Sequence, residues 1–167
     1  MKYLETPISE EDIANLEVGD IVNISGWIYC GRDAVLPKII MEAESGTLDR
    51  KVDLRGGVIF HTAVSPAGVG PTSSNKKEIE ESFGPLSKLG IKLHLGKGAI
   101  GAATIELLKE NNSVFAVIPP TTALFEDQTY ERELLVHPEL GMEALYRIKV
   151  KNYQAIIAVA KGRSIYE

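Results

Sequence analysis

The middle of the chain alternates strand-like and helix-like segments, and this alternation constrains the fold more than any other feature of the sequence. Residues 91–95 (IKLHL) predict a strand, residues 103–112 (ATIELLKENN) repeat their apolar side chains at helical spacing, and residues 114–118 (VFAVI) are entirely apolar. Short runs without polar residues are typical of strands covered on both faces, as in parallel sheets. This part of the chain therefore predicts a strand-helix-strand unit.

Three further elements are predicted before it. Ser9 is followed by three acidic residues, a pattern typical of the capped start of a short helix. Residues 21–30 alternate β-branched or aromatic residues with small or polar ones, which predicts a half-buried strand. Asp33 is expected to cap a helix that runs to about Ala43, with Pro37 in the first turn, where backbone N–H groups lack partners inside the helix.

The next part of the chain is rich in glycine, proline and serine. Residues 57–64 predict a strand, and residues 65–75 (SPAGVGPTSSN) predict a polar loop. A helix is expected to begin with residues 76–83, to break at Gly84-Pro85, and then to resume until Gly90.

The C-terminal part predicts short extended segments separated by turns. A brief helical interruption is expected over residues 139–145, among candidate strands at residues 130–137, 146–153, 155–162 and 164–166. The whole sequence indicates an α/β fold with a mixed sheet flanked by helices and additional antiparallel strands at the two ends. Because no long polar linker divides the chain, residues 1–167 are expected to form a single domain.

Composition excludes several classes of function. The 18 basic and 23 acidic residues give a formal net charge of −5, which argues against a dedicated binder of nucleic acid or of an anionic membrane. The longest apolar stretch, residues 155–160, is far shorter than the roughly 20 residues of a membrane span, and the acidic N-terminus is unlike a signal peptide. A cytoplasmic location is therefore expected. The single cysteine, Cys30, cannot by itself hold a zinc ion or an iron-sulfur cluster.

Glycine occurs beside cationic or hydroxyl side chains at three predicted strand-to-helix junctions. These junctions are residues 31–33 with Arg32, residues 70–76 with Lys76, and residues 96–98 with Lys97. In open α/β sheets such junctions gather at the carboxyl ends of the strands, where helix N-termini favour anions. The planar fork of Arg32 suits a carboxylate, and Lys76 or Lys97 can hold a second one, so the pattern favours a small dicarboxylate ligand.

Each junction also has a purely structural interpretation. Arg32 and Asp33 can form a local surface pair, Thr72 and Ser73 can cap the following helix, and Lys97 can be fully solvated. It is the recurrence of the pattern at three junctions that favours a binding site.

Other polar residues are assigned structural roles. Thr121 and Thr122 are not followed by a nearby cation and are expected to form a turn or a cap. His61, His94 and His137 lack the spacing of metal ligands and are expected to be hydrogen-bonded structural residues.

Residues 96–101 (GKGAIG) match the glycine pattern of a dinucleotide-binding turn. The motif follows a predicted strand and opens a helix, but no acidic residue comes before Glu126 after the next strand. A nucleotide-binding module is therefore kept as an alternative interpretation.

Four blocks of the sequence together resemble a known family. They are residues 18–34 (VGDIVNISGWIYCGRDA), 69–78 (VGPTSSNKKE), 95–98 (LGKG) and 139–166 (ELGMEALYRIKVKNYQAIIAVAKGRSIY), and in order and spacing they resemble the beta subunit of iron-sulfur-dependent class I fumarate hydratases and L-tartrate dehydratases. The resemblance implies a swivelling β/β/α domain. It also implies a cysteine-bearing alpha subunit that carries a 4Fe-4S cluster, in a heterotetramer of two alpha and two beta subunits.

The resemblance further implies roles for individual residues. Thr72 would exchange the proton at C3 of a hydroxy dicarboxylate, while Arg32, Lys76 and Lys97 would bind its carboxylates. Asp33 would orient Arg32 or cap the following helix. Ser73, Gly96 and Gly98 would support these groups, and no metal ligand is expected in this chain. The expected activity is the reversible dehydration of (S)-malate to fumarate by the heteromeric enzyme.

Four positions depart from the usual family pattern. Leu36 and Pro37 replace a histidine and a lysine, Asn75 replaces a glycine, and Lys76 replaces an arginine. The last change keeps the charge but loses a bidentate contact, which is enough to change the preferred diacid. L-tartrate or another diacid is therefore an alternative substrate, and a non-catalytic regulatory or scaffolding homologue is a further alternative.

Overall fold

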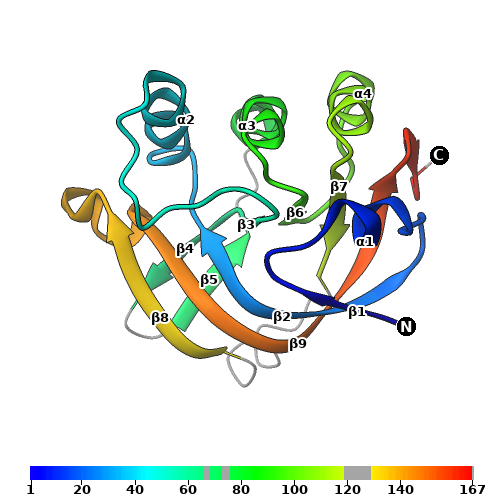
Figure 1. Ribbon diagram of the computed structural model, residues 1–167, viewed down its shortest axis with the longest axis horizontal. Coiled ribbons are helices and arrows are strands. Elements are labelled where there is room, and N and C mark those ends of the chain that lie inside the picture. The colour runs from blue at the N-terminus through cyan, green and yellow to red at the C-terminus, as the bar shows by residue number, and fades with distance from the viewer. Residues whose placement is uncertain (66–67, 73–75, 119–128, 167) are drawn as a thin grey trace.

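The computed structural model describes residues 1–65, 68–72, 76–118 and 129–166 (Figure 1). Four parallel strands form the centre of the sheet in the order β2 (Ile21–Cys30), β3 (Val58–Phe60), β6 (Leu93–Gly96) and β7 (Val114–Val117). The short strand β1 (Lys2–Glu5) pairs in parallel with the first half of β2. The predicted parallel unit in the middle of the chain is thus confirmed.

Helices cover one face of this parallel layer. They are α2 (Leu36–Ser45), α3 (Lys76–Lys88) and α4 (Ala102–Glu110), which lie side by side above the strands in Figure 1. Their apolar side chains pack on the sheet in two clusters, one under α2 that includes Val35 and Ile39, and one under α3 and α4 that includes Phe83 and Leu108.

The long strand β9 (Leu145–Ala160) closes the sheet on itself. It runs antiparallel to β2, from Cys30 opposite Tyr146 to Ile21 opposite Ile156, and it also pairs with β7, where Ala116 lies opposite Ile157. The strands β8 (Thr129–Val136) and β10 (Arg163–Ser164) extend this antiparallel layer. The chain therefore forms an α/β structure with a mixed sheet, three flanking helices and additional antiparallel strands, as the sequence predicted.

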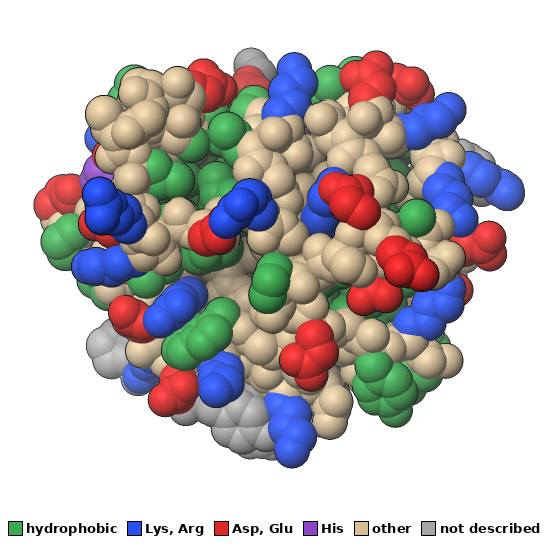
Figure 2. All heavy atoms as spheres, viewed as in Figure 1, with side chains coloured by type: hydrophobic (Ala, Val, Ile, Leu, Met, Phe, Trp, Pro, Cys, Tyr) green, Lys and Arg blue, Asp and Glu red, His purple; other side chains and the backbone are tan. Residues whose placement is uncertain are grey.

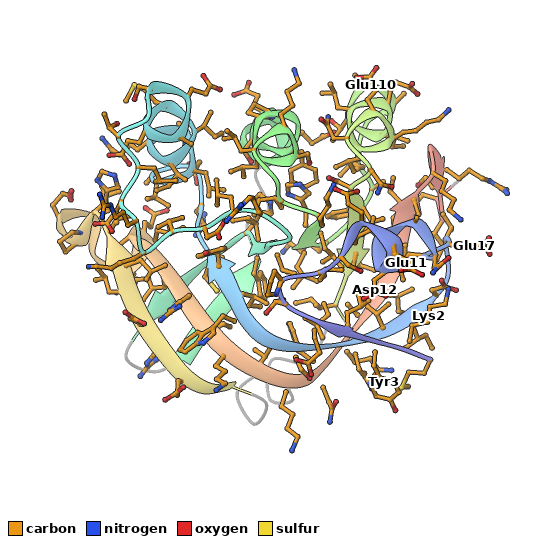
Figure 3. The ribbon with its side chains drawn as sticks, in the orientation of Figure 1. Lys2, Tyr3, Glu11, Asp12, Glu17 and Glu110 are labelled. Atoms are coloured by element: carbon orange, nitrogen blue, oxygen red, sulfur yellow. The ribbon has the colours of Figure 1, made fainter. Side chains whose placement is uncertain are left out.

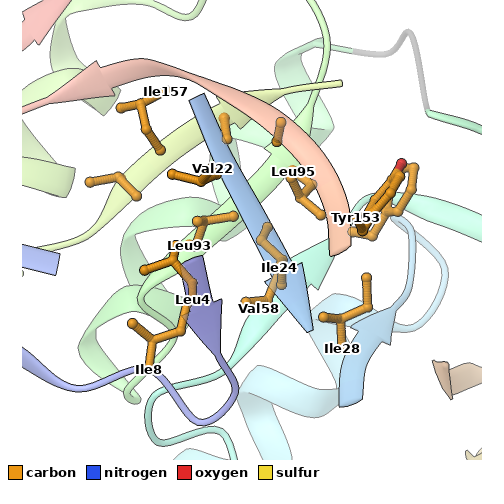
Figure 4. Packing of buried hydrophobic residues seen from close by; sticks show 14 of the residues in the cluster. Leu4, Ile8, Val22, Ile24, Ile28, Val58, Leu93, Leu95, Tyr153 and Ile157 are labelled. Carbon is orange, nitrogen blue, oxygen red and sulfur yellow. The ribbon is translucent and has the colours of Figure 1, made fainter. Parts of the chain in front are cut away.

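The main core lies between the parallel and the antiparallel strands. It is filled by buried aliphatic and aromatic side chains, and those labelled in Figure 4 are Leu4, Ile8, Val22, Ile24, Ile28, Val58, Leu93, Leu95, Tyr153 and Ile157. Apart from Ile8, which lies between β1 and α1, these side chains come from β1, β2, β3, β6 and β9, so this core requires the closed sheet.

Acidic residues near the amino end of β2, away from its carboxyl end, form ion pairs with lysines: Asp20 with Lys2, Glu10 with Lys92 and Glu17 with Lys161. The helix α1 (Glu10–Ala14) is capped by Ser9, whose side chain accepts a hydrogen bond from the Asp12 N–H, as predicted. Glu11, Asp12 and Glu17 lie on this side of the molecule (Figure 3). Elsewhere on the face shown in Figure 2, acidic and basic side chains are interspersed. Within the described residues, no helix has the length and apolarity needed to cross a membrane.

The predicted break at Gly84-Pro85 is wrong, because α3 is continuous through both residues. The helix is kept in place on both sides of the proline by Phe83 and Leu86, which are fully buried. Gly84 serves close packing rather than a break, since a Cβ atom there would lie 3.0 Å from Leu107 Cδ1 of α4. Packing of α3 against its neighbours outweighs the one backbone hydrogen bond that proline removes.

Two strand predictions are corrected. Residues 57–64 do not form one strand: β3 ends at Phe60, and β4 (Thr62–Ser65) turns away to pair with β5 (Gly68–Thr72). The predicted polar loop thus contains a strand of a two-stranded hairpin. The segments at residues 146–153 and 155–162 are not separate either, since most of both belongs to β9, which bends at Asn152 with a φ of 52°.

Candidate functional site

The carboxyl ends of β2, β3 and β6 lie next to one another. Cys30 is opposite Phe60, and Phe60 is opposite Leu95. Just beyond the strands, the Gly31 N–H donates to the Phe60 carbonyl at 3.1 Å and the His61 N–H donates to the Leu95 carbonyl at 3.3 Å. The three glycine-containing segments singled out in the sequence therefore follow three adjacent parallel strands at one edge of the sheet.

Arg32 follows β2 and is half-buried. Its Nε atom is buried and makes no hydrogen bond in the described part of the chain. The same atom lies 3.8 Å from Asp33 Oδ1 and 3.7 Å from Glu143 Oε1, which are ion-pair distances too long for hydrogen bonds. Glu143 ends the 3₁₀ helix η1 (Pro138–Glu143) and was not predicted as a site residue. It lies in a block of family resemblance, but no local motif marks it.

Asp33 does not cap the helix after it. The α2 helix begins at Leu36, and its N-cap residue is Val35, whose side chain makes no capping hydrogen bond. Asp33 instead forms an ion pair with Arg32. Pro37 lies in the first turn of α2, as predicted, and α2 ends at Ser45, two residues beyond the predicted end.

Thr72 is the last residue of β5, and its backbone lies opposite Thr62 of β4. Thr62 directly follows His61, so the hairpin leaves the carboxyl end of β3, between the ends of β2 and β6. The backbone of β4 also lies close to η1. Lys76 is the first residue of α3. Ser73 lies outside the described residues, as do the side chains of Thr72 and Lys76.

Lys97 follows β6 and is exposed. Gly96 before it is buried against Phe115, where a Cβ atom would lie 3.0 Å from the ring. Gly98 after it has a φ of 76°, a conformation that disfavours other residues. Both glycines therefore shape the turn that presents Lys97 at the strand edge.

The N-terminus of α4, where the dinucleotide motif would hold a phosphate, is already occupied by a carboxylate. Glu80 of α3 accepts a hydrogen bond from the Gly101 N–H at 2.7 Å and another from Thr104 Oγ1 at 2.8 Å. A negative charge at this position satisfies the helix end and repels a phosphate. This contact argues against the nucleotide-binding interpretation.

The histidines have structural surroundings. The rings of His61, Phe83 and His94 pack together, with centroids 4.3 to 5.8 Å apart. Burial lowers the pKa of His61 to about 3 and that of His94 well below its ordinary value, so both rings are neutral near pH 7. His94 Nε2 lies 2.9 Å from Ser87 Oγ, while neither ring nitrogen of His61 has a hydrogen-bond partner among the described residues.

His137 differs from the two buried histidines. Its Nε2 atom lies 2.9 Å from Glu42 Oε1, and this contact raises its pKa above the ordinary value. It therefore links η1 to α2 as part of an ion pair.

A cavity of about 480 Å³ lies between α2 and α3, beside the Arg32 loop. It is lined by Asp33, Pro37, Ile40, Glu81 and Ser82. Two carboxylates in this lining disfavour a dianion in the cavity itself. The cationic residues of the candidate site follow the strand ends instead.

A 4Fe-4S cluster does not fit this chain. The thiol of Cys30 is fully buried, and burial raises its pKa, which disfavours the thiolate that an iron-sulfur cluster requires. Among the described residues, no three His, Cys, Asp or Glu side chains lie together in a way that could hold a metal ion.

Comparison with known proteins shows similarity along the whole chain. Residues 2–167 match the family model described as Fumarase C-terminus. The chain is 33% identical to a putative fumarate hydratase class I of Geobacillus stearothermophilus, over 98% of this chain and 33% of that protein. It therefore spans about a third of the length of that relative.

Two other relatives are closer to this chain in length. The L(+)-tartrate dehydratase subunit beta of Escherichia coli is 31% identical over 93% of this chain and 81% of its own. A putative L(+)-tartrate dehydratase subunit beta of Methanocaldococcus jannaschii is 30% identical over 100% of this chain and 92% of its own. The resemblance recognised in the four sequence blocks is thereby confirmed, and the chain belongs to the Fumarase C-terminus family.

Proposed function

We propose that this chain is the beta subunit of a hydro-lyase that reversibly removes water from a hydroxy dicarboxylate. Its relatives carry the names fumarate hydratase class I and L(+)-tartrate dehydratase subunit beta, which support this reaction class. The observation that carries the proposal is the position of the Arg32 loop, the β4–β5 hairpin and the Lys97 loop at the carboxyl ends of three adjacent strands. We propose (S)-malate and fumarate as the substrate pair, with tartrate as the alternative.

The proposed roles follow from the chemistry of each side chain. Arg32, Lys76 and Lys97 bind the carboxylates of the substrate. Their positive charges replace the water molecules that solvate the free dianion. Thr72 exchanges the proton at C3, and a hydroxyl needs an adjacent base for this, which we assign to a carboxylate of the partner. Asp33, Ser73, Gly96 and Gly98 support these groups.

The iron-sulfur cluster belongs, in this proposal, to a cysteine-bearing alpha subunit in a heterotetramer of two alpha and two beta subunits. When bound there, the cluster supplies a Lewis acid for the hydroxyl at C2. Residues 1–167 act as one unit that binds and orients the diacid and moves the C3 proton. We place the complex in the cytoplasm.

Reconstitution tests the proposal. The purified chain alone is expected to be folded and inactive on malate, fumarate and tartrate. After anaerobic co-expression with its alpha subunit and with iron, it is expected to gain activity, followed by the absorbance of fumarate. Full activity of the chain alone would contradict the proposal. Assembly without turnover of any of these diacids would instead favour the scaffolding alternative, and tight binding of NAD or ATP in equilibrium dialysis would favour the nucleotide-binding one.

Substitutions in the reconstituted complex test the individual roles. Thr72→Ala is expected to lower kcat by about 10²- to 10⁴-fold with little change in KM, since it removes a group needed only for proton transfer. Arg32→Ala and Lys97→Ala are expected to lower kcat/KM by weakening the binding of the diacid. Steady-state kinetics with malate and tartrate separates the two effects, and wild-type rates in all three variants would contradict the assignments.

Lys76→Arg tests which diacid the site prefers. This change restores a bidentate fork, and we expect it to shift the ratio of kcat/KM between malate and tartrate by about 5- to 100-fold. An unchanged ratio would show that position 76 does not determine the preference.

A further inference from the structure

Glu143 reaches the candidate site from the far end of the sequence. Strand β9 begins at Leu145 and pairs with β2 so that Tyr146 lies opposite Cys30. The residues just before β9 therefore lie beside the residues just after β2. In this position Glu143 Oε1 is 3.7 Å from Arg32 Nε.

The Glu143 carboxylate contacts one particular edge of the Arg32 guanidinium. Both Glu143 and Asp33 make their closest approach to Nε, the nitrogen nearest the aliphatic stem, and not to the terminal amino groups. The two terminal amino groups form one of the two forks through which a guanidinium binds a carboxylate in a bidentate manner. Pairing at Nε therefore orients the guanidinium and leaves this fork for a ligand.

Glu143 and Asp33 connect Arg32 to different parts of the fold. Asp33 is adjacent to Arg32 in the chain, so their pair can move as one loop. Glu143 belongs to η1, which lies close to β4 of the hairpin that carries Thr72 and which is joined to α2 through His137 and Glu42. Of these two contacts, the one with Glu143 ties Arg32 to an element that also lies close to the hairpin.

We propose that Glu143 is a positioning residue that orients the Arg32 guanidinium toward the carboxylate of the substrate. This assignment rests on the proposed function, which supplies the dicarboxylate ligand. Glu143 touches neither substrate nor cluster in this proposal, and it acts only through Arg32.

The first test compares two carboxylates of the same 3₁₀ helix in the reconstituted complex. Glu143→Gln is expected to raise KM for the diacid about three- to fivefold with kcat within twofold, the size of effect that a partly exposed ion pair supplies. Glu139→Gln is the matched control, because Glu139 lies in η1 but pairs with His137 and not with Arg32. Equal KM values for the two variants would overturn the proposal.

The second test asks whether Glu143 acts through Arg32. In an Arg32→Lys background, Glu143→Gln is expected to cause no further rise in KM, because lysine has no Nε edge to be oriented. If the rise persists in this background, Glu143 has a merely structural role and the proposal fails.

The third test needs no turnover, so it separates this proposal from the proposed function. Arginine labelling with phenylglyoxal, followed by peptide mass spectrometry, measures the reactivity of each guanidinium in the reconstituted complex. Glu143→Gln is expected to speed labelling of Arg32 about threefold relative to Arg55, while Glu139→Gln leaves the ratio unchanged. Unchanged Arg32 labelling in Glu143→Gln would overturn the proposal even in an active enzyme, and faster labelling in an inactive complex would uphold the pair while the proposed reaction fails.

Discussion

Among single residues, two buried histidines link the stability of the folded state to pH. His61 and His94 are fully buried and packed against Phe83, and burial lowers the pKa of both. Position in the sequence suggested ordinary structural histidines with hydrogen bonds. His94 has such a partner in Ser87, whereas His61 has none among the described residues, because its ring is enclosed by Phe83 and His94.

This environment predicts a loss of stability in acid. The unfolded chain takes up protons on these histidines below about pH 6.5, whereas folded His61 does so only near pH 3. The stability due to neutral His61 is thus fully present above pH 6.5. It falls by about 1.4 kcal/mol per pH unit as the pH drops toward 3. Urea unfolding at pH 7 and pH 5 measures this slope, and His61→Phe is expected to reduce it.

The control for this prediction is His137, whose pKa is raised by Glu42. Its contribution has the opposite sign: it is present below pH 6.5 and is lost as the pH rises through the raised pKa. His137→Gln is therefore not expected to reduce the acid sensitivity. A wild-type pH slope in His61→Phe would contradict the buried neutral state of His61.

Among the elements, the ends and the packing of the helices show which sequence-based predictions were correct. The pattern at Ser9 predicted a local cap correctly, because the capping partner lies three residues away. The cap of α4 could not be predicted in this way, because Glu80 reaches it from α3. The prediction of a break at Gly84-Pro85 was wrong for a related reason. Gly84 allows α3 to pack closely against α4, and this contact lies outside the local sequence.

The contact between α3 and α4 gives a second prediction. Glu80→Ala removes the acceptor for the Gly101 N–H and the Thr104 hydroxyl, and it is expected to lower the free energy of unfolding by about 1 kcal/mol. Chemical denaturation measures the change. Glu81→Ala on the same helix is the matched control, since Glu81 is exposed and contributes no such cap. Equal stability of the two variants would show that Glu80 does not cap α4.

For the whole molecule, closure of the sheet by β9 is the central feature. Ile157 lies where this closure occurs: its N–H donates to the Asp20 carbonyl at 2.8 Å, its backbone lies opposite Ala116 of β7, and its side chain is fully buried in the main core. The core between the two layers therefore depends on the C-terminal strand being in place.

The third prediction tests this dependence with two isoleucines. Ile157→Ala is expected to lower the free energy of unfolding by about 2 to 5 kcal/mol, because it leaves a cavity at the place where the sheet closes. Ile165→Ala removes the same atoms from an exposed position and is expected to change stability by less than about 0.5 kcal/mol. Similar losses in both variants would show that the closure contributes little to stability.

Local sequence patterns account for the features that depend on neighbouring residues. The limits of β2, the start of α1, the strand-helix-strand unit and the glycine-containing segments around Arg32, Thr72 and Lys97 all follow from local spacing and local backbone preference. The family resemblance also rests on such short blocks, and the comparisons confirmed it.

The features that join distant residues are set by the folding of the whole chain and become visible in the three-dimensional structure. The closed sheet, the single long strand β9, the Glu80 cap and the approach of Glu143 to Arg32 each depend on strand pairing or helix packing between segments far apart in the chain. Local patterns carry no information on such contacts, because burial and pairing are properties of the assembled core. For this reason the sequence could place Arg32 at a strand end but could not reveal the carboxylate that orients it.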